Sequence, residues 1–114
     1  MPAIESDTGA EVAQAQTQIG INWSLLGPTI AIELVGNGVS ELGTATFRAR
    51  RDGSDGAADG VIVATVTASS SSATPGHGGT TISNPGGYGR IILTAQSSAA
   101  TKNCSFRDIM LTIQ

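Results

Sequence analysis

Three aspartates, each followed by a glycine, lie close together in the middle of the chain: Asp52, Asp55 and Asp59. Carboxylates among glycines suit a hard cation such as calcium, because glycines let the backbone fold around the ion. Dense calcium loops use alternate positions and often a closing glutamate, whereas these aspartates are three and four residues apart without one. Asp-Gly is also a common turn dipeptide. The pattern favours turn chemistry and leaves a calcium site as the alternative.

Three arginines, Arg48, Arg50 and Arg51, directly precede this acidic segment. One interpretation is that they neutralise the aspartates that follow. The other is that they contact a carboxylate on a partner subunit, which the planar guanidinium group binds well. They form the only basic cluster of a chain whose formal net charge is -3, so the sequence argues against nucleic acid as a partner.

Residues suited to catalysis are sparse in this chain. The single histidine, His77, lies between glycines and is typical of a solvated loop residue. The single cysteine, Cys104, excludes an internal disulfide and is typical of a small buried residue. Nothing predicts that the two meet as a catalytic pair, and no serine lies in a nucleophile-elbow motif. The sequence therefore predicts a protein that is not an enzyme and uses no cofactor.

Two large aromatic residues are candidates for surface contacts. Trp23 continues an alternation with Ile19 and Ile21, which favours core packing over a sugar-stacking platform. Tyr88 lies between two glycines and is the better candidate for an exposed contact.

The segment that carries the aspartates is expected to be a hairpin. Strand-forming residues at Thr44–Arg50 and Val61–Ala68 flank the turn-rich residues 51–60. Ala45, Phe47 and Ala49 are expected on one face of the first strand. Val61-Ile-Val is apolar on both faces, which predicts a central strand.

Other short strands are expected along the chain, separated by turn signals. Gly36-Asn-Gly38 is one such signal. A low-complexity loop is expected over residues 69–87, with a short strand at Thr80–Ser83, and a slip in apolar phase predicts a bulge near Arg107 or Asp108. The remaining strands are expected near residues 19–23, 30–34, 90–96 and 104–114. Together these features predict an all-β fold, an antiparallel β-sandwich or jelly roll of six to seven short strands.

Residues 1–18 are expected to form an N-terminal extended arm outside a β-sandwich domain that spans residues 19–114. The arm is polar, with Ile4 and Val12 as its only sizeable apolar residues. Thr8-Gly-Ala-Glu11 fits a capping box, which allows a short helix over residues 10–16. Polar termini are ordered when something holds them, so the arm is expected to lie against another subunit. Its first residues lack the basic and apolar regions of a secretory signal. The sequence has no run of about 18 apolar residues, so no membrane span is expected.

In organisation the chain resembles small all-β accessory proteins of bacteriophage virions, of the decoration or tail-associated kind. The resemblance lies in the unprocessed start, the polar arm, the strands rich in Ser, Thr, Gly and Ala, and the missing catalytic set. The last strand, Cys104-Ser-Phe-Arg-Asp-Ile-Met-Leu-Thr-Ile113, looks like the closing strand of carbohydrate-binding jelly rolls.

The first resemblance implies a structural virion protein that stabilises a capsid or tail through subunit contacts. It would be made in the host cytoplasm and would form a homo-oligomer or lattice with copies of itself or with other virion proteins. The alternative is a β-sandwich module that binds a carbohydrate or a host surface. The expected partner contacts are Ile4, Val12, Arg48, Arg50, Arg51 and Tyr88.

Overall fold

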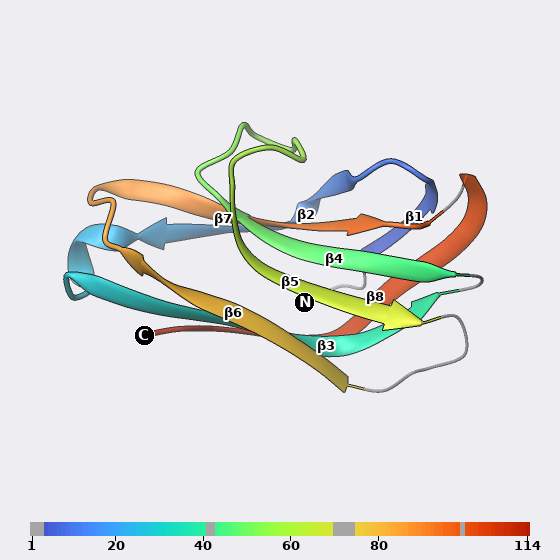
Figure 1. The fold of residues 1–114 in the computed structure, drawn as a ribbon. Coiled ribbons are helices and arrows are strands. Elements are labelled where there is room, and N and C mark those ends of the chain that lie inside the picture. Colours follow the sequence, from blue (N-terminus) through green and yellow to red (C-terminus); the bar gives the residue numbers. More distant parts are fainter. Residues whose placement is uncertain (1–3, 41–42, 70–74, 99) are drawn as a thin grey trace.

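The computed structural model describes residues 4–40, 43–69, 75–98 and 100–114, which fold into two packed antiparallel sheets (Figure 1). Sheet A has the strand order β1 (Ile4–Thr8), β8 (Ala100–Ile113), β3 (Thr29–Ser40) and β6 (Pro75–Ser83). Sheet B has the order β2 (Val12–Asn22), β7 (Tyr88–Gln96), β4 (Thr44–Arg51) and β5 (Val61–Ser69).

The predicted all-β antiparallel sandwich is confirmed, but the described residues form eight strands rather than six to seven. Strand β1, which lies in the predicted arm, was not expected, and β6 contains the short strand predicted at Thr80–Ser83 but begins earlier, at Pro75, within the predicted loop over residues 69–87. The only helical segment among the described residues is the three-residue turn η1 (Trp23–Leu25), and none of these residues form a helix long and apolar enough to cross a membrane.

The core lies between the two sheets and is centred on a pair of phenylalanines. The rings of Phe47 on β4 and Phe106 on β8 are stacked, with centroids 4.5 Å apart and an angle of 16° between their planes. Burial of a Phe side chain contributes roughly 1.5–3 kcal/mol. Strand β3 alternates as predicted, with Ile30, Ile32 and Leu34 buried in the core.

The predicted turn at Gly36-Asn-Gly38 is wrong, because β3 runs straight through it. A Cβ on Gly36 would lie 2.6 Å from Cζ of Phe106, and one on Gly38 would lie 2.9 Å from Cε2 of Phe47. The two glycines therefore leave room for the stacked rings rather than reverse the chain.

The predicted hairpin is confirmed as β4 and β5, which pair from Thr44 opposite Ser69 to Arg51 opposite Val61. The prediction that its second strand is central is wrong, since β5 is the edge of sheet B. Val61 and Ile62 are accordingly 51% and 47% exposed. The edge is approached by β6 of the other sheet, where a Cβ on Gly78 would lie 2.0 Å from the carbonyl oxygen of Thr65.

The segment predicted as an arm is extended, but it belongs to the domain. Strand β1 pairs with β8, with Ile4 opposite Phe106, and β2 pairs with β7, with Val12 opposite Ala95. The short helix over residues 10–16 is not formed, and the expected boundary after Gln18 falls inside β2. Backbone pairing to both sheets overrides the low apolar content on which the prediction of a separate arm depended.

The bulge predicted near Arg107 and Asp108 is confirmed. Pairing between β3 and β8 shifts between Val35, which lies opposite Met110, and Asn37, which lies opposite Arg107. Asp108 has a positive φ of 54° and its carboxylate accepts a hydrogen bond of 2.8 Å from the Asn37 amide.

A larger bulge interrupts β2, where five residue steps from Ala13 to Gln18 lie opposite two steps of β7. Within it, the buried Thr17 donates its hydroxyl proton to the backbone carbonyl of Leu93, at 3.2 Å. The hydroxyl thus supplies a hydrogen bond where the regular ladder is interrupted.

Candidate functional site

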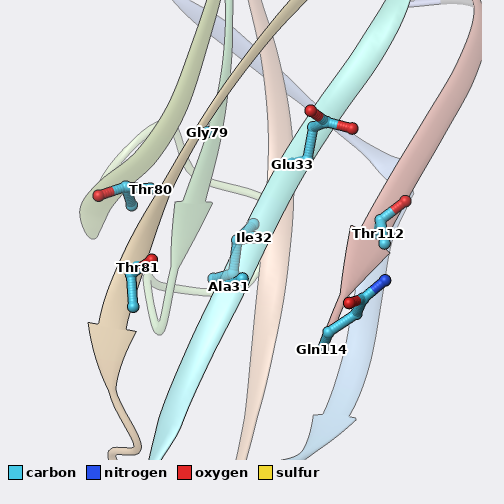
Figure 2. Close-up of a pocket in the computed structure, with 8 residues that line it drawn as sticks. All are labelled: Ala31, Ile32, Glu33, Gly79, Thr80, Thr81, Thr112 and Gln114. Atoms are coloured by element: carbon cyan, nitrogen blue, oxygen red, sulfur yellow. The ribbon is translucent and has the colours of Figure 1, made fainter.

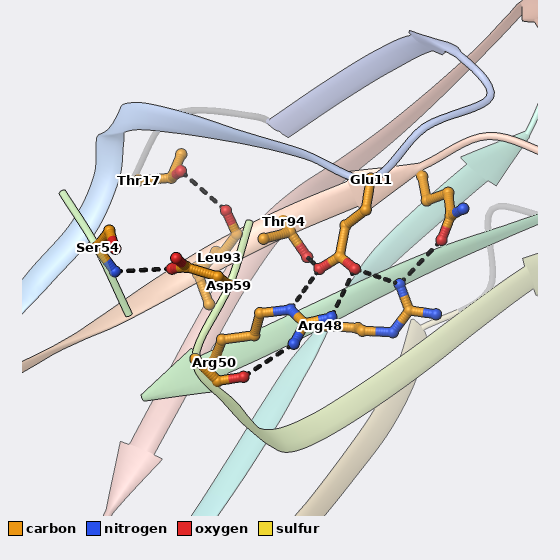
Figure 3. Close-up of polar contacts among 10 residues, drawn as sticks. Glu11, Thr17, Arg48, Arg50, Ser54, Asp59, Leu93 and Thr94 are labelled. Carbon is orange, nitrogen blue, oxygen red and sulfur yellow. Dashed lines mark hydrogen bonds and ion pairs between the residues drawn. The ribbon is translucent and has the colours of Figure 1, made fainter. Parts of the chain in front are cut away.

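Glu11, between β1 and β2, holds the N-terminal segment onto the outer face of sheet B (Figure 3). Its carboxylate accepts from Nε and Nη2 of Arg50, both at 2.7 Å, from Nη1 of Arg48 at 3.0 Å, and from the hydroxyl of Thr94 at 2.6 Å. The two-pronged contact with Arg50 is the strongest geometry for such a pair. Arg48 and Arg50 therefore both bind a carboxylate of the same chain. The sequence analysis had not linked Glu11 to these arginines.

Burial alone would raise the pKa of Glu11, but the hydrogen bonds from Arg50 and Thr94 and the charges of Arg50 and Arg48 hold it below its ordinary value. The hydrogen bond to Glu11 raises the pKa of Arg50. The folded state thus favours the ionised carboxylate. This stabilisation is complete above the unfolded pKa, near 4.5, and is lost as pH falls through the lower folded pKa.

Glu11→Gln should therefore lower the free energy of unfolding by about 2 kcal/mol at neutral pH, because it leaves two partly buried arginines without their anion. The difference from the unmodified protein should shrink as the pH falls below about 4.5, where the native carboxyl group also becomes protonated. Urea unfolding at several pH values measures both quantities. The control is Glu33→Gln, which makes the same charge change on the exposed face of β3. A constant difference across pH would contradict this role of Glu11.

The three loop aspartates each have a donor from the protein, and they face different partners. Asp59 accepts from the backbone N–H of Ser54 at 2.7 Å, and Asp55 accepts from the side-chain amide of Gln18. The bond from Ser54 lowers the pKa of Asp59. Asp52 is described below with the pocket that it lines.

The bond from Ser54 to Asp59 lies within the loop, as in turn chemistry, whereas the bond from Gln18 to Asp55 joins the loop to β2. Across the part of the chain that the structure describes, no three His, Cys, Asp or Glu side chains are grouped so that they could hold a metal ion. Asp52 itself has a positive φ of 57°, a conformation that aspartate tolerates better than most residues.

A shallow pocket of about 400 Å³ opens where β4 leaves sheet B beside the start of β7. Tyr88 and Arg90 on β7 and Asp52 after β4 supply its side chains, and Gly53 and Gly89 complete the lining. Tyr88 is 85% exposed, as the sequence predicted for a contact residue. The volume lies in the range of small-ligand sites.

Asp52 is held in this pocket by two donors. The indole N–H of Trp23 lies 3.2 Å from its Oδ1, and Nη1 of Arg51 lies 2.9 Å from its Oδ2. A Cβ on Gly89 would lie 2.0 Å from the same Oδ1, so only glycine lets the carboxylate reach Trp23. Trp23 is thus buried in the core, as predicted, and also positions a polar group of the pocket.

A second, shallow groove of about 420 Å³ lies on the outer face of sheet A (Figure 2). Glu33 on β3 lies between Thr112 of β8 and the pair Thr80 and Thr81 of β6. The small residues Ala31 and Gly79 also line the groove. It contains no aromatic side chain.

Comparisons with known proteins were made by family model, by sequence and by structure. No family model and no curated protein matches the chain. Among solved structures, it is similar to part of a glycoside hydrolase family 43 arabinoxylan arabinofuranohydrolase from Bacillus subtilis, crystallised in complex with cellotetraose. The TM-score is 0.57 at 16% identity, over 98% of this chain and 24% of that one. The chain thus spans about a quarter of that enzyme's length, and the likeness shows the fold alone.

The structure brings together only some of the residues singled out in the sequence. Asp52 and Tyr88 meet in one pocket, and Arg51 pairs with Asp52 beside it. Val12 is half-buried in β2, whereas the side chain of Ile4 lies outside the described part of the structure. Cys104 is buried, as expected.

Sequence reasoning missed Glu11 and Arg90. Arg90 was treated only as the first residue of a strand, although its spacing of two from Tyr88 places both side chains on the same strand face. That spacing was the available signal. No comparable signal marks Glu11, which meets its arginines across 37 and 39 positions of sequence.

Proposed function

We propose that this protein is a carbohydrate-binding β-sandwich domain whose site is the pocket around Tyr88. The observation that carries the proposal is an aromatic side chain left 85% exposed beside an aspartate and an arginine in a concave site. A soluble domain gains nothing in stability from a tyrosine so exposed, and exposed aromatics next to polar groups are typical of recognition sites.

The chemistry of the pocket suits a sugar. One face of a sugar ring carries C–H groups that stack on an aromatic ring, while its hydroxyls need fixed donors and acceptors around the edge. Tyr88 offers the ring, Asp52 the acceptor and Arg90 the donor. Asp52 is oriented by Trp23 and Arg51, which reduces the entropy lost when a ligand binds.

The structural comparison supports the same class of ligand. The similar part of the Bacillus subtilis enzyme belongs to a protein named for arabinoxylan and crystallised with cellotetraose. Proteins that act on polysaccharides are one setting in which a domain of this fold would bind a glycan without itself being catalytic.

The proposal is one of binding and not of catalysis. Of the residues that line the pocket, Asp52 alone has a carboxylate. Glycoside hydrolysis ordinarily uses two carboxyl groups roughly 5–10 Å apart across the scissile bond.

Tyr88→Ala should weaken glycan binding about five- to ten-fold, because an aromatic stacking contact contributes about 1 kcal/mol beyond buried area. Tyr88→Phe should retain most of the affinity, since the ring remains. A glycan array first identifies the ligand, and isothermal titration calorimetry then compares the variants.

The matched control for this experiment is Met110→Ala, which removes an exposed side chain from β8 in the other sheet and should leave the affinity unchanged. Thermal unfolding checks that each variant is folded. An array without any ligand, or equal affinity of the unmodified protein and Tyr88→Ala, would refute the proposed site.

The second candidate is the structural virion role, with copies of this chain or other virion proteins as partners. Adjacent exposed apolar side chains at Val61 and Ile62 on β5 favour assembly, because burial of these side chains against another chain would remove apolar surface from water. The argument from a separate N-terminal arm no longer supports this role. Native mass spectrometry distinguishes the two candidates: a concentration-independent monomer is expected for a simple binding domain, and a defined oligomer for a virion component.

A further inference from the structure

We propose that the pocket around Tyr88 selects glycans that carry uronate carboxylates, with Arg90 as the residue that binds the carboxylate. This inference rests on the proposed glycan-binding function and names its ligand class. It comes from the position of Arg90, the hydrogen-bonding capacity that it has left, and the balance of charges around it.

Arg90 and Tyr88 are two residues apart on β7 and therefore lie on the same face of the strand. Their Cα atoms are separated by about 7 Å along a strand, comparable with one sugar ring and its carboxylate substituent. On the neighbouring strand, Gly20 lies opposite Arg90, and nothing lies within 4 Å of the space where its side chain would be. A ring stacked on Tyr88 can therefore present a substituent to Arg90 without obstruction from β2.

The guanidinium of Arg90 has unused donors. Its one hydrogen bond to the described residues runs from Nη1 to the carbonyl of Gly53 at 3.4 Å, beyond the usual range for a strong N–H···O bond. An arginine side chain has five N–H donors in a planar fork that matches a carboxylate. Arg48, Arg50 and Arg51, by contrast, each already hold a carboxylate.

The local charge also favours an anion. Asp52 is the acidic residue in the pocket lining, and its charge is balanced by Arg51 at 2.9 Å. Asp55 and Asp59 in the same loop are bonded to Gln18 and Ser54 and do not line the pocket. Of the two charged side chains in the lining, Arg90 is therefore the one without an opposite charge bound to it among the described residues.

The whole chain has a formal net charge of -3, which would by itself repel an anionic ligand. At physiological salt, however, charges more than about 8 Å apart in solvent are largely screened. A contact with Arg90 at hydrogen-bonding distance is screened much less than the contributions of negative charges elsewhere on the chain.

The test compares cellotetraose with its uronate form, in which every primary alcohol is oxidised to a carboxylate, by isothermal titration calorimetry on the full chain. The pair differs only in the group that Arg90 should bind. A galacturonate tetramer and its neutral galactose counterpart form a second pair with different stereochemistry. The uronate of at least one pair should bind about ten-fold more tightly than its neutral form, and the preference should fall as salt increases.

Arg90→Gln should abolish this preference, because it should weaken binding of the uronate form far more than binding of the neutral oligosaccharide, for which glutamine still offers a hydrogen-bond donor, and Arg90→Lys should retain part of it. The matched control is Arg107→Gln, which removes the same charge from an exposed position on β8 outside the pocket and should keep the full preference. Heteronuclear NMR spectra confirm that each variant is folded.

The outcomes separate this inference from the proposed function. If neutral and uronate forms bind equally, or if Arg90→Gln weakens both equally, the uronate inference is wrong while glycan binding stands. If neither form of either pair binds and a glycan array finds no other ligand, both proposals are wrong. Equal loss of preference in Arg90→Gln and Arg107→Gln would show a general charge effect and would also overturn the assignment to Arg90.

Discussion

Deletion of residues 1–18 should leave a chain that does not fold cooperatively. The deletion removes β1 from the edge of sheet A and more than half of β2 from sheet B. It also removes Glu11, the anion that joins Arg48, Arg50 and Thr94. The free energy of unfolding of a domain of this size is only about 5–15 kcal/mol. The stabilisation lost with both strand segments and Glu11 should exceed this free energy.

The physical reason is that the outer face of β7 depends on this segment for cover. Ile92 and Thr94 are both fully buried although they alternate with the inward-facing Ile91 and Leu93. A strand that is buried on both faces must have other residues packed against each face. Without residues 1–18, the hydroxyl of Thr17 no longer reaches the carbonyl of Leu93, and two arginines lose their partner.

Far-UV circular dichroism and heteronuclear NMR spectra of residues 19–114 measure this outcome, together with urea unfolding. A shorter deletion, of residues 1–9, is the matched control because it removes β1 but keeps Glu11 and β2. It should be destabilised but folded. A dispersed spectrum and nearly unchanged stability for residues 19–114 would instead show that the segment is a dispensable arm, as the sequence had suggested.

The hairpin of β4 and β5 could be predicted almost to the residue, because local chemistry determines it. Alternating apolar residues at Ala45, Phe47 and Ala49 place one strand face inward, and Asp-Gly pairs mark the connection. The bulge at Asp108 could be predicted for a similar reason, since a change in apolar phase is visible within a few residues.

Glycines were the main source of error, because the same residue serves in turns and in close packing. Gly36 accommodates the ring of Phe106, 70 positions away, Gly38 the ring of Phe47 on the next strand, and Gly78 the backbone of β5. No local pattern distinguishes these positions from turns. The glycine-rich first half of β6 was mistaken for a loop for the same reason, whereas its end at Thr80–Ser83 was expected as a strand.

The polar contacts that define the candidate site could not be predicted from local sequence patterns either. Tyr88 could be singled out from its glycine neighbours, and Asp52 from its Asp-Gly motif. Their proximity depends on the backbone N–H of Asp52 donating to the carbonyl of Arg90, across 38 positions of sequence. Only the arrangement of β4 beside β7 brings them into one pocket.

Gly36→Ala should lower the free energy of unfolding by about 3 kcal/mol, at the upper end of the cost of overpacking a well-packed core. The new methyl group would lie 2.6 Å from Cζ of Phe106 and 2.9 Å from both of its Cε atoms. Strand β3 cannot move away easily, because it is paired with β6 on one side and β8 on the other. Phe106 cannot move easily either, since its ring is stacked on Phe47.

A double-mutant cycle with Phe106→Leu tests this cause directly. Leucine lacks the far end of the ring, so Gly36→Ala should cost less than about 1 kcal/mol in that background, although Phe106→Leu is itself destabilising. Urea unfolding of the four proteins gives the coupling energy. The matched control is Gly20→Ala on β2, where nothing lies within 4 Å of the new methyl group.

Gly20→Ala should change the stability by no more than about 0.5 kcal/mol, because an exposed strand glycine has no packing to lose. Replacement of glycine by alanine otherwise reduces the entropy of the unfolded chain and favours the folded state slightly. A large loss at Gly36 and none at Gly20 would therefore isolate the clash with the ring. An equal cost of Gly36→Ala with phenylalanine or leucine at position 106 would instead place the strain in the backbone of β3 and refute the account of these glycines as space for the stacked pair.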